Sequence, residues 1–152
     1  VKMCELIDGT VFVFDEIGLQ NSNTFELAKL MQQKGPNLPV YPDPAGKART
    51  SNSTKSDHAI LRESGFSVIS RKANPTQKDR LNALNKKFEN AKGKHELFIS
   101  PKCKNVIRDL ELTTIDDGRI VKTETLSHFL DGLMYPVEYR YGFKGHGSSI
   151  KW

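Results

Sequence analysis

The stretch Val40–Gly46 most constrains the fold, because two prolines flank one aspartate at the end of an apolar run. Residues 38–41 are predicted to form a short buried strand. Pro42 and Pro44 lack an amide hydrogen, so strand pairing has to stop there. Asp43 is therefore predicted at a strand end, where many α/β proteins place a metal ligand or an acid–base residue. An ordinary Asp-Pro turn is the alternative explanation.

Strand-like and helical patterns alternate along the rest of the chain, and Gly, Pro or capping residues bound them. Strands are expected at 2–7, 10–17, 38–41, 66–70, 96–99, 112–115 and 119–121. Helices are expected from Asn23 to Gly35, from Ser56 to Gly65, from Pro75, at the first helical position, to Gly93, from Ser100, and from about Thr125 to about Tyr139. The Asp8-Gly9 turn suits a two-residue hairpin between the first two strands.

This order predicts an α/β fold in which helices cover a mixed sheet. The 152 residues suit one domain, expected over 1–141, with a flexible Gly-, Ser- and Lys-rich tail over 142–152. Hydrophobic content of 37% and charged content of 27% indicate a soluble protein with no membrane-spanning segment or signal peptide. The net charge of +5 favours a polyanionic partner.

The last predicted helix carries an unusual polar side. Its apolar stripe is expected to pack on the sheet and consists of Leu126, Phe129, Leu130, Leu133 and Val137. His128, Asp131 and Tyr135 share the opposite side at helical spacing. A solvated helix face is the plain alternative, but Gly132 costs a helix interior about 1 kcal/mol relative to Ala. We interpret that glycine as a sign that something approaches the helix closely there.

Several short motifs follow one another between Val11 and Tyr139. They are Tyr41–Gly46 (YPDPAG), Ser56-Asp57, Leu61–Gly65 (LRESG), Arg80–Asn85 (RLNALN), Leu97–Cys103 (LFISPKC), Leu110-Glu111 and His128–Tyr135 (HFLDGLMY). In order and spacing the chain resembles the nuclease domain of the large terminase subunit of tailed bacteriophages.

The resemblance implies a ribonuclease-H-like fold and an endonuclease that cuts concatemeric viral DNA during genome packaging. That family uses an acidic cluster and two divalent metal ions, Mg²⁺ or Mn²⁺. Matched by position, Asp43 is the acid after the fourth strand, and His128 and Asp131 belong to the His-x-x-Asp of the last helix. The family's first acid is expected upstream of Val1, and no Gly-x-x-x-x-Gly-Lys-Ser/Thr motif of the ATPase motor occurs.

The same resemblance implies the partners and the compartment. Double-stranded DNA, the terminase ATPase domain, the small terminase subunit and the portal protein are the expected partners. The expected place of action is the bacterial host cytoplasm, with no membrane involved.

The chemistry agrees with the resemblance. Two metals about 3.5–4 Å apart activate an in-line water and stabilise the leaving alkoxide. Such hard cations prefer oxygen ligands, so Asp43 and Asp131 are expected to meet across the sheet edge. His128 would ligate Mn²⁺, shuttle a proton or contact the scissile phosphate. With only two acids, this chain alone is expected to cut DNA poorly.

Further candidate residues have equally plain alternatives. Asp15, Glu16 and Asp57 are weaker metal candidates, since a solvated hairpin end or a favourable helix dipole also accounts for them. Contacts to DNA phosphates are expected from Lys47, Arg49 and Lys55 in one loop and from Arg71, Lys72, Lys78 and Arg80. Simple solvation explains these basic residues as well. His58, His95 and His146 are interpreted as surface residues.

Two other functional classes remain open. The chain could be a catalytically incomplete module that docks DNA or packaging proteins through its basic loop and tail. It could also be another ribonuclease-H-like enzyme, of the transposase or resolvase type.

Overall fold

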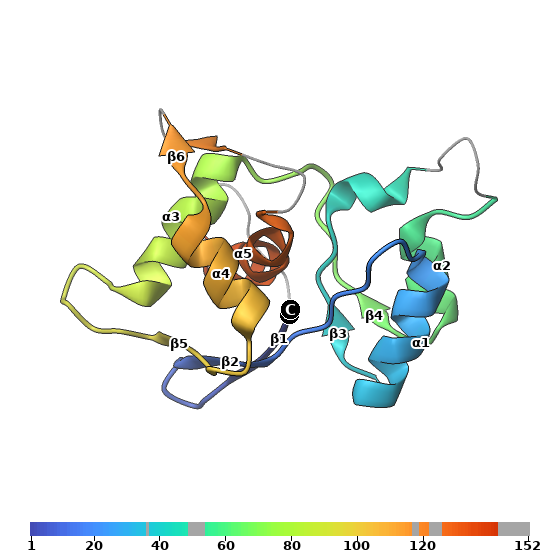
Figure 1. The fold of residues 1–152 in the computed structure, drawn as a ribbon, viewed down its shortest axis with the longest axis horizontal. Coiled ribbons are helices and arrows are strands. Elements are labelled where there is room, and N and C mark those ends of the chain that lie inside the picture. Colours follow the sequence, from blue (N-terminus) through green and yellow to red (C-terminus); the bar gives the residue numbers. More distant parts are fainter. Residues whose placement is uncertain (36, 49–53, 117–118, 122–125, 143–152) are drawn as a thin grey trace, which may run out of the picture. The chain divides into compact units, whose positions relative to one another are not determined.

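A computed structural model describes residues 1–35, 37–48, 54–116, 119–121 and 126–142. The chain is a mixed α/β protein, as predicted, and its residues group into two compact units (Figure 1). The first unit comprises Glu16–Asn74 together with Val1, and the second comprises Lys2–Asp15 and the chain from Pro75 onward. Each unit has its own strands and helices.

The first unit contains two helices, a two-stranded parallel sheet and one turn of 3-10 helix. Its elements are α1 (Thr24–Lys34), β3 (Pro39–Val40), η1 (Pro44–Lys47), α2 (Asp57–Glu63) and β4 (Ser67–Val68). Both predicted helix starts are confirmed, because Asn23 accepts a hydrogen bond from the Glu26 amide and Ser56 accepts one from the Ala59 amide. The apolar core comprises Ala28, Leu61 and Phe66, with Met31, Val40 and Val68 packed against it.

The strand predicted at 38–41 is shorter and less buried than expected. Only Pro39 and Val40 pair, with Ser67 and Val68 of β4. Pro39 is exposed and cannot donate a ladder hydrogen bond, and Pro42 prevents extension in the other direction. The prediction of a buried strand is therefore wrong, whereas its end just before Asp43 is confirmed.

The second unit is built on a three-stranded sheet of order β1-β2-β5. β1 (Lys2–Glu5) and β2 (Val11–Asp15) are antiparallel, and β5 (Leu97–Ile99) is parallel to β2. The prediction of a two-residue hairpin turn is wrong, because Glu5 pairs with Val11 and a longer turn lies between them. Within that turn the Asp8 carboxylate accepts a hydrogen bond from the Thr10 amide at 2.9 Å.

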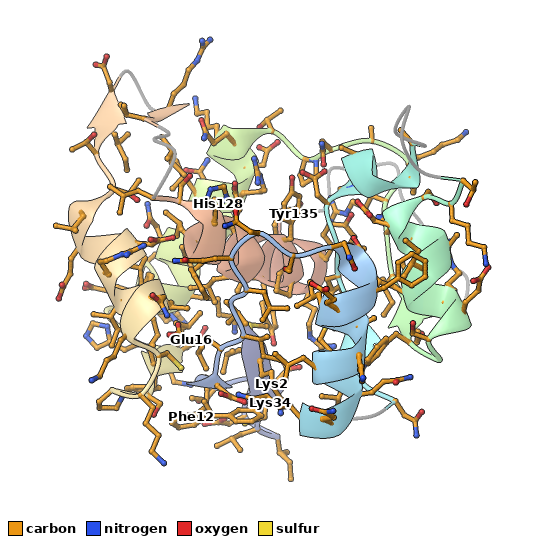
Figure 2. The ribbon with its side chains drawn as sticks, turned by 45° about the vertical axis from the view of Figure 1, so that its right-hand side comes forward. Lys2, Phe12, Glu16, Lys34, His128 and Tyr135 are labelled. Carbon is orange, nitrogen blue, oxygen red and sulfur yellow. The ribbon has the colours of Figure 1, made fainter. Side chains whose placement is uncertain are left out.

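The two faces of this sheet differ in their side chains. Val11, Val13 and Leu97 are buried, and the helices of the second unit lie on one side of the sheet (Figure 1). Phe12, which Figure 2 labels, pairs with Phe98 of β5; their stacked ring centroids are 5.4 Å apart, and both residues are exposed. Buried and exposed residues thus alternate along β2, as in a strand with one covered face.

The remaining elements of the second unit are three helices and a small hairpin. They are α3 (Gln77–Phe88), α4 (Lys104–Leu112), β6 (Ile115–Asp116), β7 (Arg119–Ile120) and α5 (His128–Tyr141). α3 begins after the cap Thr76 rather than at Pro75, because the Thr76 hydroxyl accepts the Asp79 amide. It also ends at Phe88, five residues before the predicted stop at Gly93.

α5 is more deeply buried than its predicted single stripe implied. It packs against α3 and α4, and Met134, Tyr135 and Glu138 are buried together with Leu130, Leu133 and Val137 of the apolar stripe. Tyr135 was predicted on the outward side, and that placement is wrong because two neighbouring helices cover a wider arc than one sheet would. His128 is exposed and Asp131 is partly buried.

None of the helices in the described part of the chain has the length and apolar character needed to span a membrane. The described strands form one three-stranded mixed sheet and two separate two-stranded sheets. A ribonuclease-H-like sheet remains a prediction.

Candidate functional site

Asp43 lies just after β3 on a turn of defined geometry. Its carboxylate Oδ1 accepts a hydrogen bond from the Ala45 amide at 2.8 Å and thereby caps η1. Its backbone carbonyl accepts two hydrogen bonds, from the Gly46 amide at 3.0 Å and from His58 Nε2 at 2.8 Å. The carboxylate itself is exposed. The turn therefore fixes the backbone while the acidic group faces solvent.

His58 is a core residue of the first unit and is only 1% exposed. The prediction of a surface histidine is wrong, because α2 turns this residue toward the turn that follows β3. A signal was present in the sequence: His58 precedes Leu61 by three residues, so both lie on one face of α2. Gly46 lies against the ring, and a Cβ added at Gly46 would be 3.1 Å from His58 Cδ2.

The other predicted residues of the first unit make contacts within that unit. Asp57 is exposed, accepts a hydrogen bond from the Thr24 hydroxyl at 2.6 Å, and lies beside Gly46. Lys47 donates to the Arg71 carbonyl, and Lys55 pairs with Glu63. Glu16 and Arg71 are half-buried, Lys72 is exposed, and Arg49 lies outside the described residues. Their roles toward metal or DNA remain predictions.

Asp131 occupies the first turn of α5 in the second unit. Its Oδ1 accepts a hydrogen bond from Arg80 Nη1 at 2.8 Å, and its side chain is 20% exposed. The Arg80 guanidinium lies over the Tyr135 ring, 4.5 Å from the centroid, and Arg80 is 7% exposed. Arg80 was predicted to contact DNA phosphates. Its guanidinium lies against Asp131 and Tyr135 and is largely buried, and a role toward DNA remains a prediction.

Asp109 supports the candidate site, and the sequence did not point to it. It is fully buried, and its Oδ2 accepts the amides of Phe129 at 2.9 Å and Leu130 at 3.3 Å. Ser127 stands at the N-cap of α5 in a left-handed conformation and makes no side-chain cap. Asp109, from α4, caps α5 instead. The available signal was an acid three residues after the buried Val106 on the apolar side of α4.

The remaining predicted residues of the second unit are near the surface. His128 is exposed at the first position of α5, and Figure 2 shows it on the same helix as Tyr135. Asp15 is half-buried, and its carboxylate lies 3.8 Å from Lys2 Nζ. His95 is exposed as predicted, with Nδ1 2.7 Å from the Phe88 carbonyl. Lys78 is exposed. His146 lies outside the described residues.

The C-terminal end of α5 is anchored to the β1–β2 hairpin. Arg140 donates to Glu5, and Lys87 donates to the Gly9 carbonyl at 2.9 Å while lying 4.0 Å from the Tyr141 ring centroid. Burial alone would raise the pKa of Glu5, but the nearby Tyr141 hydroxyl, the hydrogen bond from Arg140 and nearby positive charge outweigh it, so the pKa lies below the usual value of a glutamate. Burial raises the pKa of the Tyr141 phenol. Both ends of α5 are thus held by polar contacts.

No family model, curated protein or solved structure matches the chain. The site is therefore interpreted from its own residues. Within the part of the chain that the structure describes, no three His, Cys, Asp or Glu side chains gather in a group that could hold a metal ion. Asp43 and Asp131 belong to different units, so their convergence on one cation stays a prediction.

Proposed function

We propose that this chain is a divalent-metal-dependent DNA endonuclease domain of the phage large terminase type, with a ribonuclease-H-like fold. The observation that carries the proposal is the turn Pro42–Gly46, which holds an exposed carboxylate in a fixed backbone just after β3. The ordered motifs from Val11 to Tyr139 that resemble this family support it, as does the net charge of +5.

The two acids fit a hard divalent cation to different degrees. Asp43 offers an exposed carboxylate, the ligand type that Mg²⁺ and Mn²⁺ prefer. Asp131 already shares Oδ1 with Arg80, so a cation there would bind a carboxylate whose charge is partly compensated. A bound pair of such cations would supply an activated water and stabilise the leaving oxygen.

The chain's own residues would position the substrate and the carboxylates. Arg80 holds Asp131 in one direction, and the Asp109 cap holds the first turn of α5 that carries Asp131. His128, exposed at the same helix start, would contact the scissile phosphate or transfer a proton. Lys47 and Lys72 are exposed and would add salt-sensitive contacts to the DNA backbone.

Nicking of supercoiled plasmid in Mn²⁺ tests this proposal. We expect slow nicking by the wild-type chain that chelation abolishes, and nicking at the metal-free level in both Asp43→Ala and Asp131→Ala. Asp116→Ala, a change at an exposed acid of β6, serves as the matched control and should nick like wild type. Unchanged nicking in either site variant removes that residue from the site.

A second function is favoured by one specific contact, the buried ion pair between Arg80 and Asp131. A carboxylate neutralised by arginine suits a structural role, as in a catalytically incomplete module that binds DNA or packaging partners. That module would bind DNA with a strong salt dependence and show no metal-dependent cleavage even when fully folded.

A further inference from the structure

The contact between His58 and the Asp43 backbone has a defined direction. A carbonyl oxygen only accepts hydrogen bonds, so His58 Nε2 must carry the hydrogen and donate it to the Asp43 carbonyl at 2.8 Å. The other ring nitrogen, Nδ1, is buried and has no hydrogen-bond partner in the described part of the chain. The hydrogen bond of the ring is therefore made to Asp43, the residue that carries the exposed carboxylate.

The packing around the ring gives this contact a precise fit. Gly46 approaches so closely that a methyl group there would stand 3.2 Å from Nε2, which is tighter than ordinary van der Waals contact. The Gly46 amide donates to the same Asp43 carbonyl at 3.0 Å. Two donors from different elements, η1 and α2, thus converge on one oxygen. This arrangement restricts the rotation of the peptide group that follows Asp43.

An apolar side chain would fill the same volume without leaving a buried nitrogen unpaired. Burying a polar group without a partner costs free energy, so a histidine used only for packing is a poor choice here. The hydrogen bond from Nε2 to the Asp43 carbonyl, which orients the turn, offsets the free-energy cost of burying Nδ1.

We infer that His58 is a positioning residue, which fixes the direction of the Asp43 carboxylate by holding the Asp43 carbonyl. The purpose of this positioning, presentation of a ligand to a divalent cation, rests on the proposed function. The hydrogen bond itself does not rest on it, and the two can be measured separately.

The experiment compares His58→Leu with His58→Gln in the 152-residue chain. Glutamine places an amide donor close to the position of Nε2, whereas leucine preserves volume and removes the donor. Amide hydrogen exchange at Ala45 and Gly46, measured by NMR, reports the order of the turn. Line broadening by Mn²⁺ at the same amides reports cation binding by Asp43. His95→Leu is the matched control, because His95 also contacts a backbone carbonyl but lies in the second unit.

We expect His58→Leu to speed exchange at Ala45 and Gly46 about tenfold, the effect of losing one hydrogen bond. His58→Gln should recover exchange to within about threefold of wild type, and His95→Leu should leave it unchanged. Exchange in His58→Leu equal to wild type, or no recovery with glutamine, would overturn the inference.

Two further outcomes separate the inference from the proposed function. If His58→Leu fails to fold, Gly46→Ala disturbs the same contact from the opposite side, and unchanged exchange at Ala45 in that variant overturns the inference. If Mn²⁺ broadens no amide near Asp43 in wild type while the exchange pattern holds, the positioning by His58 stands and the nuclease proposal falls.

Discussion

The two units hold their candidate acids in opposite ways. In the first unit, His58 grips the backbone carbonyl of Asp43, and the carboxylate stays exposed. In the second unit, Arg80 grips the carboxylate of Asp131 itself, and Asp109 holds the surrounding helix start through two amides. One acid is positioned through its main chain and the other through its charge.

This difference teaches which acid is better prepared to bind a cation. An exposed carboxylate is accessible to a cation, whereas an ion pair with a buried arginine compensates the charge and fixes its geometry. Asp43 therefore has the features of a primary ligand. Asp131 has those of a ligand that binds only as part of a larger cluster, or of a structural residue.

The largest effect on stability is expected from Asp109→Ala, which removes the side chain that caps the start of α5. The change removes the acceptor of the Phe129 and Leu130 amides inside a fully buried site. We expect a loss of about 3 kcal/mol in the free energy of unfolding, measured by urea titration. Asp109→Asn keeps one acceptor oxygen and should lose clearly less. Equal stability of wild type and Asp109→Ala would refute the capping role.

A smaller effect is expected when Arg80 is replaced by Met, which leaves the Asp131 carboxylate without its buried partner. Since the Asp131 side chain is 20% exposed, we expect a loss of about 2 kcal/mol, below that of a fully buried pair. Adding Asp131→Asn to the same chain should recover part of the loss. A double variant no more stable than Arg80→Met would show that charge compensation is unimportant here.

The smallest effect concerns the far end of α5 and its dependence on pH. The folded-state pKa of Glu5 lies below the usual value of a glutamate, so its contribution to stability is present above that usual value and is lost as pH falls through the lower folded value. Because the pair is largely exposed, the contribution is expected to stay below about 1 kcal/mol. Urea midpoints of wild type and Glu5→Gln at pH 6 and pH 3 measure it. The two proteins should differ at pH 6 and converge at pH 3; a constant difference would contradict this sign.

Local signals in the sequence predicted local structure well. The helix caps Asn23 and Ser56 and the end of strand pairing before Pro42 each depend on neighbouring residues alone. The start of α3 was misplaced because Pro75 and Thr76 both suit a helix entry, and the threonine hydroxyl provides the cap.

Buried polar residues could not be placed in the same way. The sequence predicted His58 at the surface and Arg80 in contact with DNA phosphates, and it did not single out Asp109. A polar side chain is buried only when a distant partner satisfies it, so their burial could not be predicted. Their partners are Asp43, Asp131 and the start of α5, and the pairing arises from tertiary structure. The candidate acids were identified from the sequence, but the residues that hold them became visible only in the fold.

Anomalous diffraction from crystals soaked in Mn²⁺ tests the central claim most directly. We expect a manganese peak within coordination distance of the exposed Asp43 carboxylate. Crystals that take up Mn²⁺ elsewhere but show no peak at the Asp43 carboxylate would contradict the proposed function.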